Sequence, residues 1–277
     1  SLVGVSLGLG TYYIFNQVLF GVWAPNTFFA KQAEYFIYQQ IPLLTRLLRE
    51  LGLPLIGVGV ALLPGSGYAV YQSIRNRNWI VIAAILWMIG YAGIYAWRLP
   101  VTYQHGRYVM PVIPVMALIG VCGVTWAIEH MTKSSVGRIF AKAWILIIGI
   151  VLTAFTGLGV RAYSVDVAVI ESEMVETAKW LAANTSKDAI LAVHDIGAVG
   201  YYSGRELIDL AGLITLEVIP FIRNEEKLAQ YINNKGAAYL VTFPDWYPYL
   251  VMGSEIVFSS GGTFSGEHGN MTVYRWR

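Results

Sequence analysis

The sequence is poor in charge and almost devoid of cysteine, and these shortages exclude several classes of protein. Only 13% of the 277 residues are charged, whereas a soluble domain carries about 25%. Mean hydropathy is +0.54, which argues against a wholly soluble protein. The single cysteine, Cys122, excludes a disulfide within the chain and says nothing about compartment. No Cys/His cluster suggests zinc, and no Ser–His–Asp arrangement can be argued from the sequence.

Acidic side chains are nearly absent from the first part of the chain. Residues 1–163 hold three (Glu34, Glu50, Glu129) against eleven basic ones, a net charge of +8. Residues 164–277 hold fourteen acidic and eight basic side chains, a net charge of −6, and the two values sum to +2. The division predicts a basic transmembrane region followed by an acidic soluble domain, with no nucleic-acid partner.

What is abundant is long apolar sequence. A membrane-spanning helix needs about 20 mostly apolar residues. Five segments qualify, at roughly 2–22, 51–73, 79–97, 108–128 and 143–163. The predicted fold class is a membrane all-α region of about five transmembrane helices, followed by a small soluble α/β domain. The motif "LLPGSGYAV" predicts a break in the second span, and Pro111 and Pro114 either kink or begin the fourth.

The basic loops predict the orientation. Loops 75–78 and 129–142 are both basic and lie on the same side of an alternating five-span topology, which should be the cytoplasm. Loops 23–50 and 98–107 then face outward, as does everything after Tyr163. We therefore expect an integral protein of the plasma (inner) membrane with an extracytoplasmic C-terminal domain. Because the chain starts without Met and directly in an apolar run, we expect a C-terminal fragment of a longer protein.

The outer loop 23–50 has features of its own. Pro25 breaks any helix that continues out of the first span. Leu44, Leu47, Leu48 and Leu51 recur at helical spacing, with charges on the other faces. This pattern predicts either a short helix lying in the membrane interface or the tail of a connecting helix.

Residues 164–277 alternate between helical and strand patterns. Ile170, Met174, Ala178 and Leu181 share one face of an amphipathic helix. A strand from Ala189, a helix ended by Gly236, and the segments "AAYLVTF", "SEIVFSS" and "MTVYRWR" follow. The alternation predicts a mainly parallel sheet, with the last strands as an antiparallel edge.

The stretch "VHDIGAVGYYSGRELIDLAGL" carries the candidate acceptor-side residues Asp195, Arg205 and Asp209. Asp195 follows a strand, where α/β folds usually present functional groups. One interpretation is that these three side chains contact the acceptor or its sugar. The other is a loop held by Asp–backbone hydrogen bonds and an Asp–Arg pair. The glycines lack the spacing of a nucleotide fingerprint and do not clearly open a helix, and His194 is interpreted as structural.

Two outer loops each place a cation at the membrane surface, Lys31 in one and Arg107 in the other. Such side chains can snorkel to lipid headgroups without specificity. Alternatively, they can converge on one phosphate, for which the planar guanidinium of arginine is suited. Residue type alone leaves both alternatives open.

Three motifs shift the balance: "HGRYVMPVIP" at 105–114, "PNTFFAKQ" at 25–32, and "DIGAVGYYSGRELIDLAGL" in the tail. Together they resemble the GT-C superfamily, which contains integral-membrane glycosyltransferases that use polyprenyl-phosphate sugars. The closest resemblance is to bacterial proteins grouped with the dolichyl-phosphate-mannose–protein mannosyltransferase and aminoarabinose transferase families. The resemblance touches most of the chain through short motifs.

The resemblance implies a transferase that moves a sugar from a polyprenyl-phosphate donor to a glycan, lipid or protein acceptor at the outer membrane face. It implies that Arg107, Lys31, His105 and Tyr108 bind the lipid phosphate of the donor. It also implies a carboxylate base from an acidic motif in the first outer loop. Glu34 and Glu50 are the carboxylates of the outer membrane-half loops, and neither matches that motif. Either the base lies upstream, as we expect, or this chain is not catalytic as given. Such enzymes often use a divalent metal (Mg or Mn), but no residues here identify a metal site.

Two other functions compete with sugar transfer. The first is a non-enzymatic polytopic membrane protein whose extracytoplasmic domain binds a ligand or partner. The second is a transporter whose broken spans form a path. No charged residue lies in the middle of a predicted span, and such residues commonly mark ion routes, which argues against transport.

Overall fold

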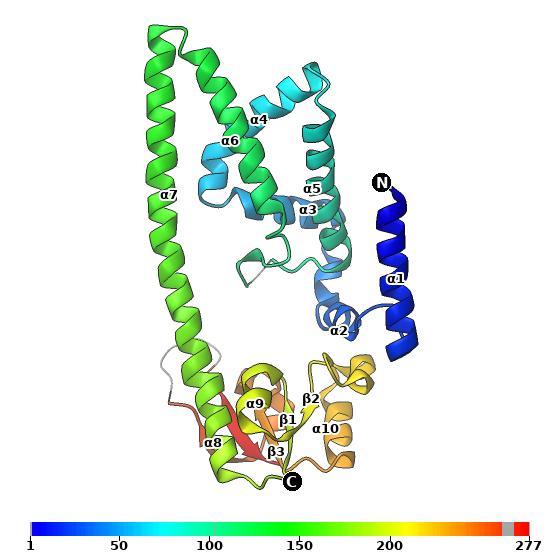
Figure 1. Cartoon of the computed structure of the whole chain (residues 1–277). Coiled ribbons are helices and arrows are strands. Elements are labelled where there is room, and N and C mark those ends of the chain that lie inside the picture. Colours follow the sequence, from blue (N-terminus) through cyan, green and yellow to red (C-terminus); the bar gives the residue numbers. More distant parts are fainter. Residues whose placement is uncertain (1, 103, 262–268, 277) are drawn as a thin grey trace. The chain divides into compact units, whose positions relative to one another are not determined.

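The computed structural model describes residues 2–102, 104–261 and 269–276, and it divides into two compact units. Unit 1 comprises residues 1–34 and 163–277, and unit 2 comprises residues 35–162. The predicted boundary between membrane region and tail, at 163/164, falls inside one continuous helix, α7 (Ser135–Val169) (Figure 1). Each unit is described by itself.

Among the described residues, every element of unit 2 is helical. They are η1 (Phe36–Gln40), α3 (Leu43–Gly52), η2 (Leu53–Leu55), α4 (Val58–Arg75), α5 (Trp79–Arg98), η3 (Gln104–Gly106), α6 (Val112–Met131) and most of α7. Helices lie over four predicted spans of this unit. Pro111 is the residue before α6, so the prolines of this span begin the helix rather than kink it.

The second predicted span, 51–73, is not one straight helix. The chain bends by 103° between Leu43–Leu55 and Val58–Arg75. The break predicted in "LLPGSGYAV" is therefore wrong in position, because Pro64 lies inside a continuous α4. The bend occurs at Gly57, which has φ of +74°, a left-handed conformation that glycine adopts without a steric penalty.

Among the described residues, three helices are long and apolar enough to cross a membrane, and a bent pair adds a fourth if it counts as one span. The three are Trp79–Arg98, Val112–Met131 and the continuous helical stretch Ser135–Asn184; the pair is Leu43–Leu55 with Val58–Arg75. The structure thus supports several candidate spans, three or up to four among the described residues, and this test does not reproduce all five predicted spans. Their apolar side chains are largely exposed on the protein surface, as lipid-facing side chains are.

The short helix expected near Leu44–Leu51 is present as α3. Its face toward the protein carries Arg46 and Glu50, both buried, while Leu44 and Leu48 are exposed. Arg46 donates a hydrogen bond to the carbonyl of Trp97 at the end of α5, at 3.2 Å. Arg46 therefore anchors the helix to its neighbour, and these two leucines point outward.

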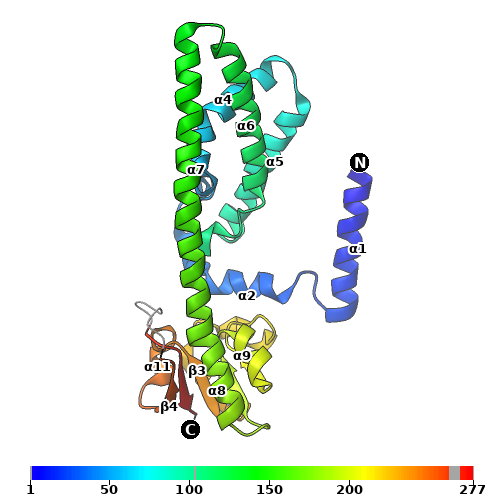
Figure 2. The same ribbon diagram turned by 60° about the vertical axis from the view of Figure 1, so that its left-hand side comes forward.

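Helices α4 and α6 pack closely through glycine (Figure 2). A Cβ atom on Gly65 would lie 2.7 Å from the carbonyl oxygen of Gly120. A Cβ atom on Gly123 would lie 1.8 Å from the carbonyl oxygen of Gly65. Absence of side chains at these positions lets the two backbones touch, which is a common way of associating apolar helices.

Unit 1 holds α1 (Leu2–Phe20), α2 (Asn26–Glu34) and the C-terminal α/β part. The helical elements of that part are η4 (Ile170–Val175), α8 (Glu176–Asn184), α9 (Ile196–Ser203), η5 (Leu216–Phe221), α10 (Glu225–Asn234), η6 (Pro244–Trp246) and α11 (Pro248–Val251). The strands are β1 (Ile190–Val193), β2 (Glu206–Asp209), β3 (Tyr239–Thr242), β4 (Glu255–Ser259) and β5 (Thr272–Arg275). Helix α1 ends before Pro25 and α2 starts after it, as predicted.

The strand order is β2-β1-β3-β5-β4. Strands β2, β1 and β3 are parallel, and β5 and β4 are antiparallel additions. The predicted antiparallel edge is confirmed, but the sheet is evenly mixed rather than mainly parallel. The elements that were not predicted are β2, the short η5, η6 and α11, and helix α9, which forms where the glycine-rich stretch did not clearly indicate the start of a helix. Gly204, with φ of +61°, ends α9.

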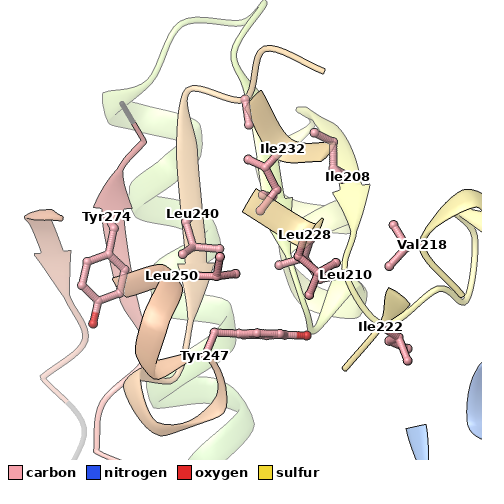
Figure 3. Close-up of a cluster of buried hydrophobic side chains, with 12 residues drawn as sticks. Ile208, Leu210, Val218, Ile222, Leu228, Ile232, Leu240, Tyr247, Leu250 and Tyr274 are labelled. Carbon is pink, nitrogen blue, oxygen red and sulfur yellow. The ribbon is translucent and has the colours of Figure 1, made fainter. Parts of the chain in front are cut away.

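Side chains that alternate along the strands build two apolar layers. Leu191, Val193 and Val241 face α8 and α9, where they pack with Ala178 and Leu181. The opposite face packs against α10, α11 and η5; the labelled members in Figure 3 are Ile208, Leu210, Val218, Ile222, Leu228, Ile232, Leu240, Tyr247, Leu250 and Tyr274. The sheet is therefore covered on both faces, and its polar groups emerge at the strand ends.

Candidate functional site

The carboxyl ends of the parallel strands carry a cluster of polar side chains. His194 directly follows β1, and Tyr247 follows β3 after the short η6. The Nδ1 atom of His194 lies 2.7 Å from the hydroxyl of Tyr247, and the edge of its ring contacts Trp246 at 4.6 Å between centroids. This edge of an open α/β sheet is where such folds commonly bind ligands.

Helix α2 completes the cluster with a carboxylate and an ammonium group. Lys31 Nζ lies 2.7 Å from Glu34 Oε2. The other oxygen, Oε1, lies 3.7 Å from Nε2 of His194, which is too long for a direct hydrogen bond. Glu34 therefore stands between a cation and an imidazole, with its side chain only 10% exposed. We name these residues, together with Tyr247, the Glu34 cluster.

Specific contacts hold α2 in place within unit 1. The guanidinium of Arg223 donates to the backbone carbonyl of Glu34 through both Nε, at 2.9 Å, and Nη2. A cation at this position satisfies the orphan carbonyls of a helix C-terminus and favours its dipole. Gly212 has φ of +69°, and its turn lies close to α2. A Cβ atom built on Gly212 would be 3.5 Å from the side chain of Ala30. The position of Glu34 is thus fixed by backbone contacts.

Burial sets the protonation of the two aromatic members. Desolvation lowers the pKa of His194 below its usual 6.5, and the negative charge of Glu34 only partly opposes this. Burial, with the Glu34 charge adding to it, raises the pKa of the Tyr247 phenol. At neutral pH the imidazole is therefore uncharged and the phenol keeps its proton. Figure 3 shows the phenol of Tyr247 beneath Leu228 and Leu210, with its oxygen directed toward the side on which Ile222 lies.

This arrangement suits proton transfer. The carboxylate of Glu34 cannot donate a hydrogen bond. If Tyr247 donates to Nδ1 of His194, the neutral ring carries its proton on Nε2, which faces Glu34; this tautomer follows from the network. Glu34 can then accept a proton from a bound hydroxyl while the ring and the Lys31 ammonium stabilise its position.

The predicted acceptor-side residues have mostly local partners. The carboxylate of Asp209 is fully buried and accepts the backbone N–H groups of Ala211, at 2.8 Å, and Ile214, at 2.7 Å. The guanidinium of Arg205 donates to the carbonyl oxygens of Ser203 and Ala182, at 2.8 Å each, and to Thr185. These bonds are those expected for a structural loop. Asp195 is half-buried beside His194 at the start of α9, and the charges of both Asp195 and Asp209 act on His194.

In unit 2, the "HGRY" motif forms a tight turn. His105 has φ of 58° and Gly106 has φ of 65°. The guanidinium of Arg107 is exposed, donates to the hydroxyl of Tyr108 at 3.0 Å, and lies 5.0 Å from that ring. Tyr108 stacks on Tyr95 of α5, at 5.5 Å between centroids. The structure thus brings three of the four predicted phosphate ligands into one turn and orients Arg107 by a cation–π contact.

Lys31, the fourth predicted ligand, belongs to unit 1, where Glu34 is its partner. The prediction that Lys31 and Arg107 bind one phosphate stays a prediction. Among the described residues, no group of three or more His, Cys, Asp and Glu side chains could hold a metal ion. The residues present therefore do not fit the divalent ion that the resemblance implies, and we assign no step to one.

Sequence reasoning missed the roles of Glu34, His194 and Tyr247 in one cluster. Glu34 was noted only because it failed to match an acidic motif, and His194 was interpreted as structural. The available signal was weak: an acidic and a basic side chain at i, i+3 on one helix, and a histidine at a strand end. Glu50, the other carboxylate of the outer loop, is fully buried in unit 2.

Comparison with known proteins gives one finding. A family model described as a domain of unknown function (DUF8728) matches residues 161–274, less than half of the chain. The matched segment begins close to the predicted start of the tail, at residue 164. No curated protein and no solved structure matches the chain.

Proposed function

We propose that this chain belongs to an integral-membrane glycosyltransferase that moves a sugar from a polyprenyl-phosphate donor to an acceptor on the outer membrane face. The observation that carries the proposal is the carboxylate of Glu34 between the Lys31 ammonium and the neutral imidazole of His194. The resemblance implies a base from an acidic motif that Glu34 does not match and that was expected upstream; we assign the role to Glu34 instead, because of its position in this cluster.

The proposed reaction needs one proton acceptor. The acceptor hydroxyl attacks C1 of the donor sugar, and its proton passes to the Glu34 carboxylate. The bond from C1 to the phosphate oxygen breaks, and polyprenyl phosphate leaves with the electron pair. Lys31 orients Glu34 through their 2.7 Å contact, and Tyr247 orients the neighbouring His194. A positioned carboxylate base contributes about 10²- to 10⁴-fold in rate.

The donor's phosphate needs a cation, because negative charge develops on it as the glycosidic bond breaks. Arg107 is the proposed ligand, since its exposed guanidinium is held by Tyr108 rather than by a carboxylate. Placement of the candidate spans in the plasma membrane, with the tail outside, is part of this proposal and is supported by the basic loops 75–78 and 129–142.

The test uses the intact protein in membranes with a panel of polyprenyl-phosphate-linked hexoses and pentoses. Glu34→Gln keeps the shape of the side chain but not its basicity, and it should lower transfer at least 100-fold, in line with the loss of a positioned base. Glu217→Gln, which neutralises an exposed carboxylate of the same unit, is the matched control and should retain activity.

Unchanged transfer in Glu34→Gln would remove this residue from the reaction. Absence of transfer by the unaltered protein with every donor, combined with binding of a ligand to the tail, would instead favour the non-enzymatic alternative. In that case the Glu34 cluster would be a recognition site for a polar ligand.

A further inference from the structure

Unit 2 contains a polar cleft at the opposite end of its helices from the Arg107 turn. The cleft has a volume of about 480 Å³ and lies where α4 ends, α5 begins and α6 ends. It is lined by amide, hydroxyl and aromatic side chains together with Glu129, His130 and Lys133. The two loops that border the cleft, 75–78 and 129–142, are the basic loops from which the cytoplasmic side was predicted.

An apolar groove adjoins the cleft. The groove has a volume of about 230 Å³ and is lined by aliphatic side chains of α5 and α6, such as Ala84 and Leu118. Asn78 and Trp126 line both hollows, so the two are direct neighbours. A polar cleft that opens into an apolar groove at the end of spanning helices matches an amphipathic molecule, with its head at the interface and its chain along the helices.

One buried group within the cleft lacks a partner. Ser73 is 1% exposed, and its hydroxyl has no hydrogen-bond partner among the described residues. A buried hydroxyl without a partner destabilises the fold by about 1–3 kcal/mol. A ligand with oxygen atoms that accept a hydrogen bond from Ser73 would offset this cost. Ser73 lines the cleft, together with Gln72 of the same helix.

Charge in the cleft is of both signs. Neither the carboxylate of Glu129 nor the ammonium of Lys133 forms an ion pair within the described part of the chain. Both side chains are exposed, and both line the cleft. A headgroup with one ammonium and one phosphate complements this pair, whereas a purely anionic headgroup would face an uncompensated carboxylate.

We propose that the cleft and groove together bind a membrane phospholipid with a primary-ammonium zwitterionic headgroup. Its phosphate accepts from Lys133 and Ser73, its ammonium donates to Glu129, and one acyl chain lies in the groove between α5 and α6. The site lies on the cytoplasmic side if the loops are oriented as proposed, and it does not depend on sugar transfer.

The experiment measures lipid retention by native mass spectrometry on the intact chain, delipidated in detergent and titrated with phosphatidylethanolamine. Ala84→Phe fills the groove and should lower occupancy at least fivefold. Ala83→Phe is the matched control, because this neighbouring residue is exposed and does not line the groove. Equal occupancy in the two variants would overturn the acyl-chain assignment.

The headgroup is tested mainly at exposed residues, whose variants are expected to fold; Ser73 is the buried exception. Lys133→Gln should lower binding of phosphatidylethanolamine and of phosphatidylglycerol alike, whereas Glu129→Gln should lower only the former. Ser73→Ala should weaken both, and Lys142→Gln, an exposed lysine outside the cleft, should weaken neither. Tighter binding of phosphatidylglycerol or phosphatidylcholine to the unaltered chain would overturn the choice of headgroup, as would unchanged binding in Glu129→Gln.

Discussion

The imidazole of His194 and the phenol of Tyr247 are joined through Nδ1 and the hydroxyl at 2.7 Å, at the end of two neighbouring parallel strands. Both side chains are largely buried, and this burial is the main cause of the lowered pKa of His194 and of the raised pKa of Tyr247. Because Nδ1 of His194 is engaged by Tyr247, the other ring nitrogen, Nε2, faces Glu34. The pair therefore links the core of the α/β part to the carboxylate of α2.

The first prediction concerns acid sensitivity. Because burial lowers the pKa of His194 in the folded chain below its unfolded value near 6.5, the unfolded chain binds more protons between the two values. The free energy of unfolding should therefore fall as pH drops from 7 through 6.5 toward the folded pKa, and level off above 7. Melting temperatures of the intact protein between pH 5 and 8, read from the transition of unit 1, measure this pH dependence. His194→Gln should flatten the dependence, and an equally steep fall in that variant would assign it elsewhere.

The second prediction concerns Arg107. Arg107→Ala should lower sugar transfer about 100-fold, the usual effect of losing a group that stabilises developing charge, without a change in melting temperature. Arg107→Lys should recover part of the activity, because it restores the charge but not the planar fork. Arg98→Ala removes another exposed arginine that lies over an aromatic ring, at 4.0 Å from Trp97, and should be nearly silent. Equal losses in both alanine variants would support non-specific contact with headgroups.

A third prediction uses two glycines of α4. Gly65→Ala places a methyl group 2.6 Å from a side-chain carbon of Val124 and 2.7 Å from the backbone of α6, so the helices must separate. Overpacking of this kind costs about 1–3 kcal/mol. Gly67→Ala has nothing within 4 Å and should leave the protein as stable or slightly more stable, since alanine favours helix. Thermal unfolding of both variants in detergent gives the comparison; a Gly65→Ala protein as stable as Gly67→Ala would show that α4 and α6 do not touch here.

The fourth prediction concerns orientation. In a Cys122→Ala background, Asn76→Cys should resist an impermeant thiol reagent in whole cells, because the loop 75–78 is expected in the cytoplasm. Lys187→Cys, at an exposed position of the tail, should react readily. Both should react after the membrane is permeabilised. The reverse pattern in intact cells would invert the topology and place the phospholipid site on the outer side.

Local sequence was sufficient for most of the individual elements. Apolar runs predicted helices at α5, α6 and α7, and leucine spacing predicted α3, because helical periodicity depends on residues within a few turns. The same local rules predicted β1, α10, β3, β4 and β5. They failed where competing signals were mixed: β2 has only four residues, of which the first and the last are acidic, and the glycines of α9 obscured a helix that packing stabilises through Val199.

Tertiary structure alone decided the site. Nothing in the spacing of Glu34, His194 and Tyr247 indicates that they meet, because their proximity depends on Arg223 fixing the end of α2 and on the parallel pairing of β1 with β3. The adjoining cleft and groove in unit 2 likewise depend on how α4, α5 and α6 pack. Sequence by itself determined what can be buried and what must face lipid or water, since that follows from the transfer free energies of single side chains. Only the fold determined which polar groups share a place, since that follows from contacts between segments far apart in the chain.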